Sequence, residues 1–132
     1  MKKMFFVSAL FVTALFACKK TEEVFLGDIF EVKKGQTLTV STIKIRLDSV
    51  QDSRCPDGAA CIQAGQAVAK LTFIKGMEQV TQSLQVAGLV RTPKPDTVLV
   101  FGKKAILINV TPYPNMNVPI PQADYKVQMK LE

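Results

Sequence analysis

The residues of this chain best suited to chemistry are Cys55 and Cys61, which lie six positions apart in the stretch DSRCPDGAACIQAG. Two such thiols can form a structural disulfide, bind a metal ion or act as a redox pair. A structural zinc site needs a full tetrahedral set of ligands, which two thiolates and a few aspartates supply poorly. A redox dithiol of the Cys-x-x-Cys type has its cysteines closer together than these two. The choice depends on the compartment, because disulfides persist outside the reducing cytoplasm.

Three acidic residues near these cysteines, Asp48, Asp52 and Asp57, raise calcium as a further alternative. Calcium prefers oxygen ligands, but the spacing of these residues does not match an EF-hand loop. Aspartates solvated in turns are the ordinary interpretation of such a pattern. We expect no metal site here, and a calcium-stabilised module stays open as an alternative.

The same region supplies a candidate binding loop, made of Asp52, Arg54, Asp57 and Tyr113. A guanidinium held in a fixed loop could clamp a carboxylate or a phosphate. More commonly, such an arginine caps loop carbonyls or pairs with a nearby aspartate, and we favour this role for Arg54. Tyr113 lies between two prolines and could be an exposed binding aromatic. We favour a packing role in which the Tyr113 side chain covers one open end of the fold.

The N-terminus, MKKMFFVSALFVTALFACKK, indicates export. Lys2 and Lys3 precede an apolar run from Met4 to Ala17. This run is shorter than the about 20 residues that a permanent membrane helix needs, and it fits the hydrophobic region of a secretory signal, roughly 7–15 residues. Residues 1–17 are therefore predicted to be a signal peptide.

The segment Leu15-Phe16-Ala17-Cys18 resembles a bacterial lipobox, in which a signal peptidase cuts before a cysteine that carries acyl chains such as palmitate. An ordinary secretory signal that contains a cysteine is the alternative. The resemblance implies a lipidated Cys18, a tether over residues 18–27 and one domain over residues 28–132. The following KKTEE is a solvated tether in the simplest interpretation, and it also resembles the segment that sends some lipoproteins of the Bacteroides group to the cell surface. We expect the outer membrane, on its periplasmic or its outer side.

With Cys18 lipidated, Cys55 and Cys61 are the only thiols left. In an oxidising compartment neighbouring thiols pair, so we expect a disulfide between them. A type I turn is predicted over Cys55–Gly58, with proline at its second position and glycine at its fourth. This turn would reverse the chain, so that Cys61 can approach Cys55. For so short a loop, the chain-entropy model predicts that the disulfide stabilises the folded state by only about 2 kcal/mol. The bridge therefore shapes a loop more than it holds the domain together.

The composition excludes several classes of function. The chain has no histidine, so neither a Ser-His-Asp or Cys-His arrangement nor a His-ligated catalytic zinc site can form. The net charge of +6 comes from scattered lysines and arginines, without the basic, aromatic-flanked stripe of a nucleic-acid-binding protein. We therefore expect no enzyme, no cofactor and no nucleic-acid partner. An atypical hydrolase that uses carboxylates at the Cys55–Cys61 loop is the alternative.

The stretch around the cysteines also resembles a family of small bacterial lipoproteins. Their pattern runs Asp-Ser-Arg-Cys-Pro, a second cysteine and Ala-Gly before a hydrophobic strand, and the matching residues are Asp52, Ser53, Arg54, Cys55, Pro56, Cys61, Ala64 and Gly65. Gln63 stands where the family often has tryptophan. The similarity extends over FEVKKGQTLTV, ILINVTPYPN and DYKVQMKL. It implies a lipoprotein, but no particular activity.

Short segments that alternate apolar and polar residues predict strands along the rest of the chain. They are QTLTV, IKIRLDSV, QAVAKLTFI, MEQVTQSLQV, TVLVF, AILINV and ADYKVQMKL. Turns at Lys75-Gly76 and at Gly102-Lys103-Lys104 join two hairpins, and the proline-rich TPYPNMNVPIP is an extended connection. Seven or eight strands of this kind predict an antiparallel β-sandwich or barrel.

Together these features predict a lipid-anchored envelope protein that acts as a non-enzymatic binding or structural module. Its membrane partner is the bilayer that holds the N-terminal lipid. An envelope protein or a glycan is the further partner that we expect, and the loops are the part of the domain offered to it.

Overall fold

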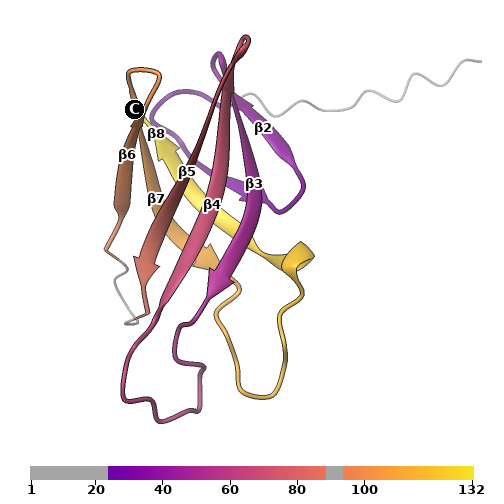
Figure 1. The fold of residues 1–132 in the computed structure, drawn as a ribbon, viewed down its shortest axis with the longest axis vertical. Coiled ribbons are helices and arrows are strands. Elements are labelled where there is room, and N and C mark those ends of the chain that lie inside the picture. Colours follow the sequence, from indigo (N-terminus) through magenta and orange to yellow (C-terminus); the bar gives the residue numbers. More distant parts are fainter. Residues whose placement is uncertain (1–23, 89–93) are drawn as a thin grey trace, which may run out of the picture.

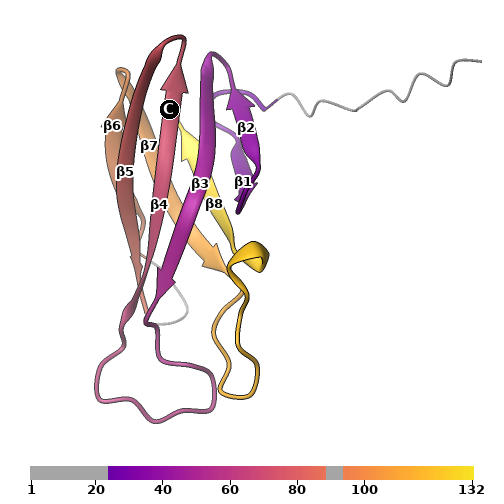
Figure 2. The same ribbon diagram turned by 45° about the vertical axis from the view of Figure 1, so that its right-hand side comes forward.

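The computed structural model describes residues 24–88 and 94–132, so the predicted signal peptide and Cys18 lie outside the described residues. Two four-stranded antiparallel sheets face each other as a sandwich rather than a closed barrel, as Figures 1 and 2 show. The described strands are β1 (Ile29–Lys33), β2 (Thr37–Val40), β3 (Ile43–Asp52), β4 (Gln66–Lys75), β5 (Glu78–Ala87), β6 (Asp96–Val100), β7 (Lys103–Thr111) and β8 (Lys126–Leu131). The expected all-β fold is confirmed.

The order of the strands separates the two sheets. One sheet has the order β2-β3-β4-β5, and the other has the order β1-β8-β7-β6. β1 and β2 therefore form the edges on one side of the sandwich, while β5 and β6 form the edges on the other. The second side is tied by the backbone N–H of Gln85, which donates to the Asp96 carboxylate over 2.9 Å. A 3-10 turn, η1 (Gln122–Asp124), leads into β8.

The core forms because each strand turns alternate side chains inward. In β8, for example, Val127, Met129 and Leu131 are buried and the residues between them are not. Large side chains from both sheets fill the space between the layers, namely Ile45, Leu47, Leu71, Phe73, Leu84, Leu107, Met129 and Leu131. All of these lie within residues 30–131, so the domain carries its own core.

One strand, β1, is missing from the sequence prediction. It alternates as the others do, with Phe30 and Val32 buried between exposed Ile29, Glu31 and Lys33. The strand pairs along its whole length with β8, which is distant in sequence. The signal was present, but the segment is short, highly exposed on one face and rich in charge.

The sandwich has two different ends, which Figures 1 and 2 show at the top and the bottom. The turn end holds the C-terminus and the tight turns, which are residues 25–28, 41–42, 76–77 and 101–102. The backbone fixes it: Gly27 N–H donates to Leu131 O over 2.8 Å, and Val24 pairs with Val40. The loop end holds two long loops, residues 53–65 and 112–121. All the residues of the candidate binding loop lie at or beside this second end.

Candidate functional site

The disulfide predicted from the sequence is present at the loop end. Cys55 and Cys61 are bonded, with their Cα atoms 5.9 Å apart. The predicted turn over Cys55–Gly58 is placed one residue too early. The hydrogen-bonded turn runs from Pro56 O to Ala59 N–H over 3.0 Å, and Gly58 sits at its third position with φ of 87°. Glycine is suited to that position because it enters the left-handed region without steric cost.

Arg54 and Asp52 form a buried ion pair beside the disulfide. Their side chains are 3% and 4% exposed. The arginine Nε donates to Asp52 Oδ1 over 2.8 Å, and Nη2 donates to Oδ2 over 2.6 Å, which makes the pair bidentate. The backbone N–H of Arg54 donates to the same carboxylate over 3.1 Å. Burying two charges is costly unless their hydrogen-bonding capacity is met, and here most of it is met within the pair.

The rest of the guanidinium ties the two sheets together. Nη1 donates to the carbonyl of Val110 over 2.8 Å, and Nη2 donates to that of Pro112 over 3.0 Å. Asp52 ends β3 in one sheet, whereas Val110 belongs to β7 in the other. Arg54 therefore joins both layers and both long loops through one side chain. The sequence favoured an arginine that pairs with an aspartate or caps loop carbonyls; Arg54 does the first with Asp52 and the second at Pro112.

Two tyrosines complete this cluster. The Arg54 guanidinium lies over the Tyr113 ring, 4.7 Å from its centroid. The Tyr113 hydroxyl lies 3.0 Å from the carbonyl oxygens of both Cys55 and Gly88, to which it donates. Tyr113 thus closes the loop end between the two loops and the end of β5. The Tyr125 hydroxyl donates to Asp52 Oδ2 over 3.2 Å.

Burial raises the pKa of the Tyr125 hydroxyl above its ordinary value, and the negative charge of Asp52 and the hydrogen bond to it raise the pKa further. The tyrosine therefore keeps its proton and stays a donor across the neutral and mildly alkaline range. Among the described residues, no buried side-chain nitrogen or oxygen lacks a hydrogen-bond partner. The cluster is a satisfied network, which is the condition under which buried polar groups rigidify a fold.

Two glycines allow the loops to approach this closely, a role that was not predicted from the sequence. A Cβ atom on Gly65 would lie 1.8 Å from Ser53 O, and one on Gly88 would lie 2.1 Å from Ala64 O. Gly88 N–H donates to Gly65 O over 2.8 Å, which joins the return of the disulfide loop to the end of β5. Gly65 also has φ of 67°. Any other residue would push the two backbones apart.

The three aspartates considered for calcium have different surroundings. Asp52 binds Arg54, while Asp48 lies on β3, where it accepts hydrogen bonds from Arg46 and Thr72 over 2.7 and 2.5 Å. Partial burial raises the pKa of Asp48, but these hydrogen bonds and the Arg46 charge outweigh it and leave the pKa lowered. Asp57 is exposed in the disulfide loop. Within the described part of the chain, no group of three His, Cys, Asp or Glu residues is placed to hold a metal ion.

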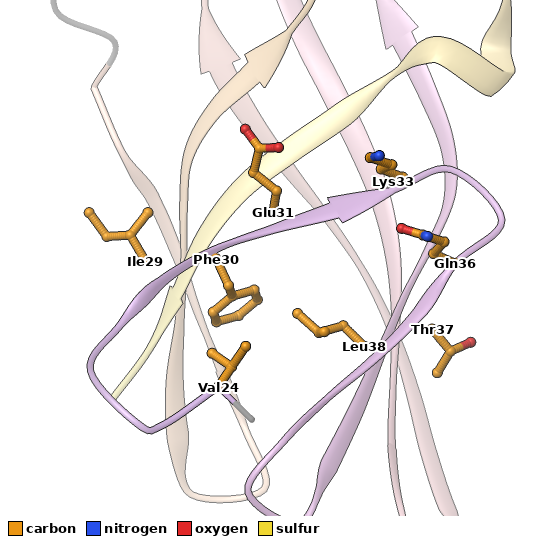
Figure 3. A pocket seen from close by; sticks show the side chains of 8 residues that line it. All are labelled: Val24, Ile29, Phe30, Glu31, Lys33, Gln36, Thr37 and Leu38. Carbon is orange, nitrogen blue, oxygen red and sulfur yellow. The ribbon is translucent and has the colours of Figure 1, made fainter. Parts of the chain in front are cut away.

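A groove of about 650 Å³ opens between the edge strands β1 and β2, as Figure 3 shows. Phe30 and Leu38 point toward each other from the two strands, with Val24 beside them, and form an apolar floor. Glu31 and Lys33 line its rim. The groove lies away from the disulfide and from every residue of the candidate binding loop.

A second, smaller hollow of about 200 Å³ lies under the proline-rich loop. Tyr113, Val118 and Ile120 line it, together with prolines at positions 112, 119 and 121 and the polar side chains of Asn115 and Asp124. Its volume suits one apolar side chain rather than a metabolite, since small-molecule sites usually measure about 300–1,000 Å³. It adjoins the cluster of Arg54 through Tyr113.

Comparison with known proteins gives no relative for this chain. No protein family, no curated protein and no solved structure matches it significantly. The resemblance to small bacterial lipoproteins therefore stays a prediction. Over residues 24–88 and 94–132, no helix has the length and the apolar character needed to cross a membrane.

Substitution Arg54→Lys should lower the free energy of unfolding by about 3 kcal/mol, because an ammonium cannot reproduce the bidentate pair and also reach both carbonyls. Arg46→Lys is the matched control, since Arg46 also pairs with an aspartate two residues away but its side chain is 43% exposed. That control should change stability by less than about 0.5 kcal/mol. Urea denaturation of both variants measures the difference. Equal losses would contradict the bracing role of Arg54.

Substitution Gly65→Ala should lower the free energy of unfolding by about 3 kcal/mol, because the new methyl group would clash with the Ser53 carbonyl oxygen. Gly102→Ala is its control: φ at Gly102 is also positive, at 76°, but nothing lies within 4 Å of a Cβ atom there. The control should cost only the left-handed strain, about 1 kcal/mol. Thermal unfolding compares the two, and a control as damaging as Gly65→Ala would remove the steric argument.

Proposed function

We propose that this protein is a lipid-anchored envelope protein whose loop end binds a partner, without catalysis. One observation carries the proposal: the two long loops of the loop end carry almost no exposed charge. Charged residues number 28 in the 132-residue chain, 17 basic and 11 acidic. In residues 53–65 and 112–121 there are two, the buried Arg54 and the exposed Asp57. Depletion of charge distinguishes the centre of a protein interface from ordinary surface.

Apolar side chains stand exposed on these two loops. Ile62 in the disulfide loop is fully exposed, and Met116 and Val118 in the proline-rich loop are about 60% exposed. The two loops are joined by a hydrogen bond from Asp57 N–H to Pro114 O over 2.9 Å. An apolar surface held on fixed loops supports recognition of a protein, because few side chains have to be ordered when the partner binds.

The smaller hollow, beside Tyr113, could receive a side chain of the partner. Interface energy concentrates in a few buried apolar anchors that fill matching pockets. The hollow beside Tyr113 has room for one such side chain, and Val118 belongs both to its lining and to the exposed set. A protein partner that offers an aliphatic or aromatic side chain fits better than a charged glycan.

The proposed lipid anchor at Cys18 joins the domain at the turn end, opposite the loop end. The lipobox-like Cys18 precedes Val24 by six residues, and Val24 is attached to Val40 near the turn end. A domain held by that tether would present its loop end away from the membrane. This arrangement supports the proposal that the loop end binds a partner in the envelope or outside the cell.

The carboxylate hydrolase is the less favoured alternative. Its best acid, Asp52, is bound by Arg54 and Tyr125 and is 4% exposed. A substrate would have to displace the packing of the loop end to reach it. The absence of histidine also leaves few groups for acid and base work at neutral pH.

Anchoring predicts a defined mass for the native protein. A chain that begins at Cys18 and carries acyl groups should gain two hydrogens on reduction, as the Cys55–Cys61 bond opens. A Cys18→Ser variant should lose the acyl mass and leave the membrane fraction. Intact-mass spectrometry of both proteins checks this. A native chain without acyl groups would contradict the anchor.

Partner binding predicts that loss of the exposed apolar side chains abolishes recognition. The double variant Ile62→Ser/Met116→Ser should weaken capture of a crosslinked envelope partner at least about tenfold, whereas Met77→Ser at the turn end should not. Capture should change little between about 0.05 and 0.5 M salt, because exposed charges are screened over that range and the two long loops carry almost none. Crosslinking on intact cells followed by quantitative mass spectrometry measures both. Capture that survives the double variant, or falls steeply with salt, would contradict the proposal.

A further inference from the structure

Exposed apolar side chains also gather at the turn end. Of the eight large apolar side chains that stand exposed in the described residues, three belong to the loop end. The other five are at or beside the turn end, namely Phe25, Leu26, Ile29, Met77 and Leu99. None of them belongs to the buried core.

We propose that this end of the domain docks on the surface of the bilayer that holds its lipid, with Phe25 and Leu26 inserted at the interface. The inference rests on the anchoring proposed above and adds a second, non-covalent contact with the membrane. The lipid surface is the best-supported binding partner for this end, because the tether attaches the turn end close to the membrane.

The length of the tether limits where this end can lie. Five residues lie between Cys18 and Val24. The six steps from one Cα atom to the next span at most about 3.6 Å each in an extended chain, or about 22 Å in total. Val24 cannot move away from the domain, since it pairs with Val40, and Gly27 is bonded to Leu131. Phe25 and Leu26 are therefore held near the headgroups at high effective concentration, and a weak affinity suffices.

The side chains next to these residues suit an interface between lipid and water. Ile29 pairs across strands with Lys130, which also forms an ion pair with Glu132, and Leu99 pairs with Lys104. Lysines beside apolar residues lay their stems on apolar surface and keep the ammonium group in the polar headgroup region. The loop end has no lysine in residues 53–65 and 112–121, which distinguishes the two ends.

The chain contains no tryptophan, so one introduced tryptophan reports its own surroundings. Phe25→Trp places it in the proposed contact, and Ile62→Trp places it at the loop end as a matched control, since both native side chains are exposed. Each acylated full-length variant is reconstituted in phosphatidylcholine vesicles with phosphatidylglycerol and with brominated acyl chains. Brominated chains quench only tryptophans that reach the hydrocarbon.

We expect at least about twofold quenching and a blue shift for Phe25→Trp, and neither for Ile62→Trp, because an aromatic ring at the interface leaves water. Adding Leu26→Ser and Ile29→Ser to Phe25→Trp should remove the quenching while the lipid keeps the protein on the vesicle. Acylated Phe25→Trp that stays as unquenched as Ile62→Trp would overturn docking alone. A protein that mass spectrometry shows to carry no acyl group would overturn the anchoring first, and docking with it.

Discussion

The buried pair of Asp52 and Arg54 is the interaction on which the loop end depends. Two charges that are almost fully removed from water are tolerable only when nearly every donor and acceptor finds a partner. This requirement brings in Val110 and Pro112 through their carbonyls, and Tyr125 through its hydroxyl. One ion pair therefore specifies where β3, β7 and both long loops lie relative to one another.

Close backbone packing and the disulfide extend this constraint outward. The glycines at 65 and 88 bring the return of the disulfide loop against the end of β5. The Cys55–Cys61 bond shortens the part of the loop that is free to move. The surface that results carries one exposed charge, that of Asp57, and three exposed apolar side chains, and polar contacts support it from beneath. Support of this kind is what a binding loop needs in order to avoid a large entropic cost on association.

Most of the fold could be predicted from the sequence, because strand periodicity is a local signal. The alternation in β3 and in β8 directly identifies the buried face, and the disulfide follows from two thiols in a chain predicted to be exported. β1 was missed because its alternation is short. The turn at Pro56 was misplaced by one residue, since proline and glycine define a turn region better than its register.

The arrangement of the site was less predictable, for a physical reason. The carbonyls that hold Arg54 lie 56 and 58 positions further along the chain, and backbone groups have no signature in a sequence. Burial of Arg54 was equally hidden, because only the assembled loops exclude water from it. Asp52 and Arg54, which were candidates for a binding loop, hold the two loops in place from beneath. The exposed Ile62 and Met116 look ordinary in the sequence and become notable only once the loops lie together.

The most direct test of this account is the backbone mobility of the two loops in the folded protein, measured as NMR order parameters. If the Arg54 cluster holds them as one surface, residues 53–65 and 112–121 should give values near those of rigid strands, about 0.85. Values below about 0.6 across both loops would show that they move freely on the nanosecond scale. That result would contradict the claim that the protein presents a pre-formed binding surface.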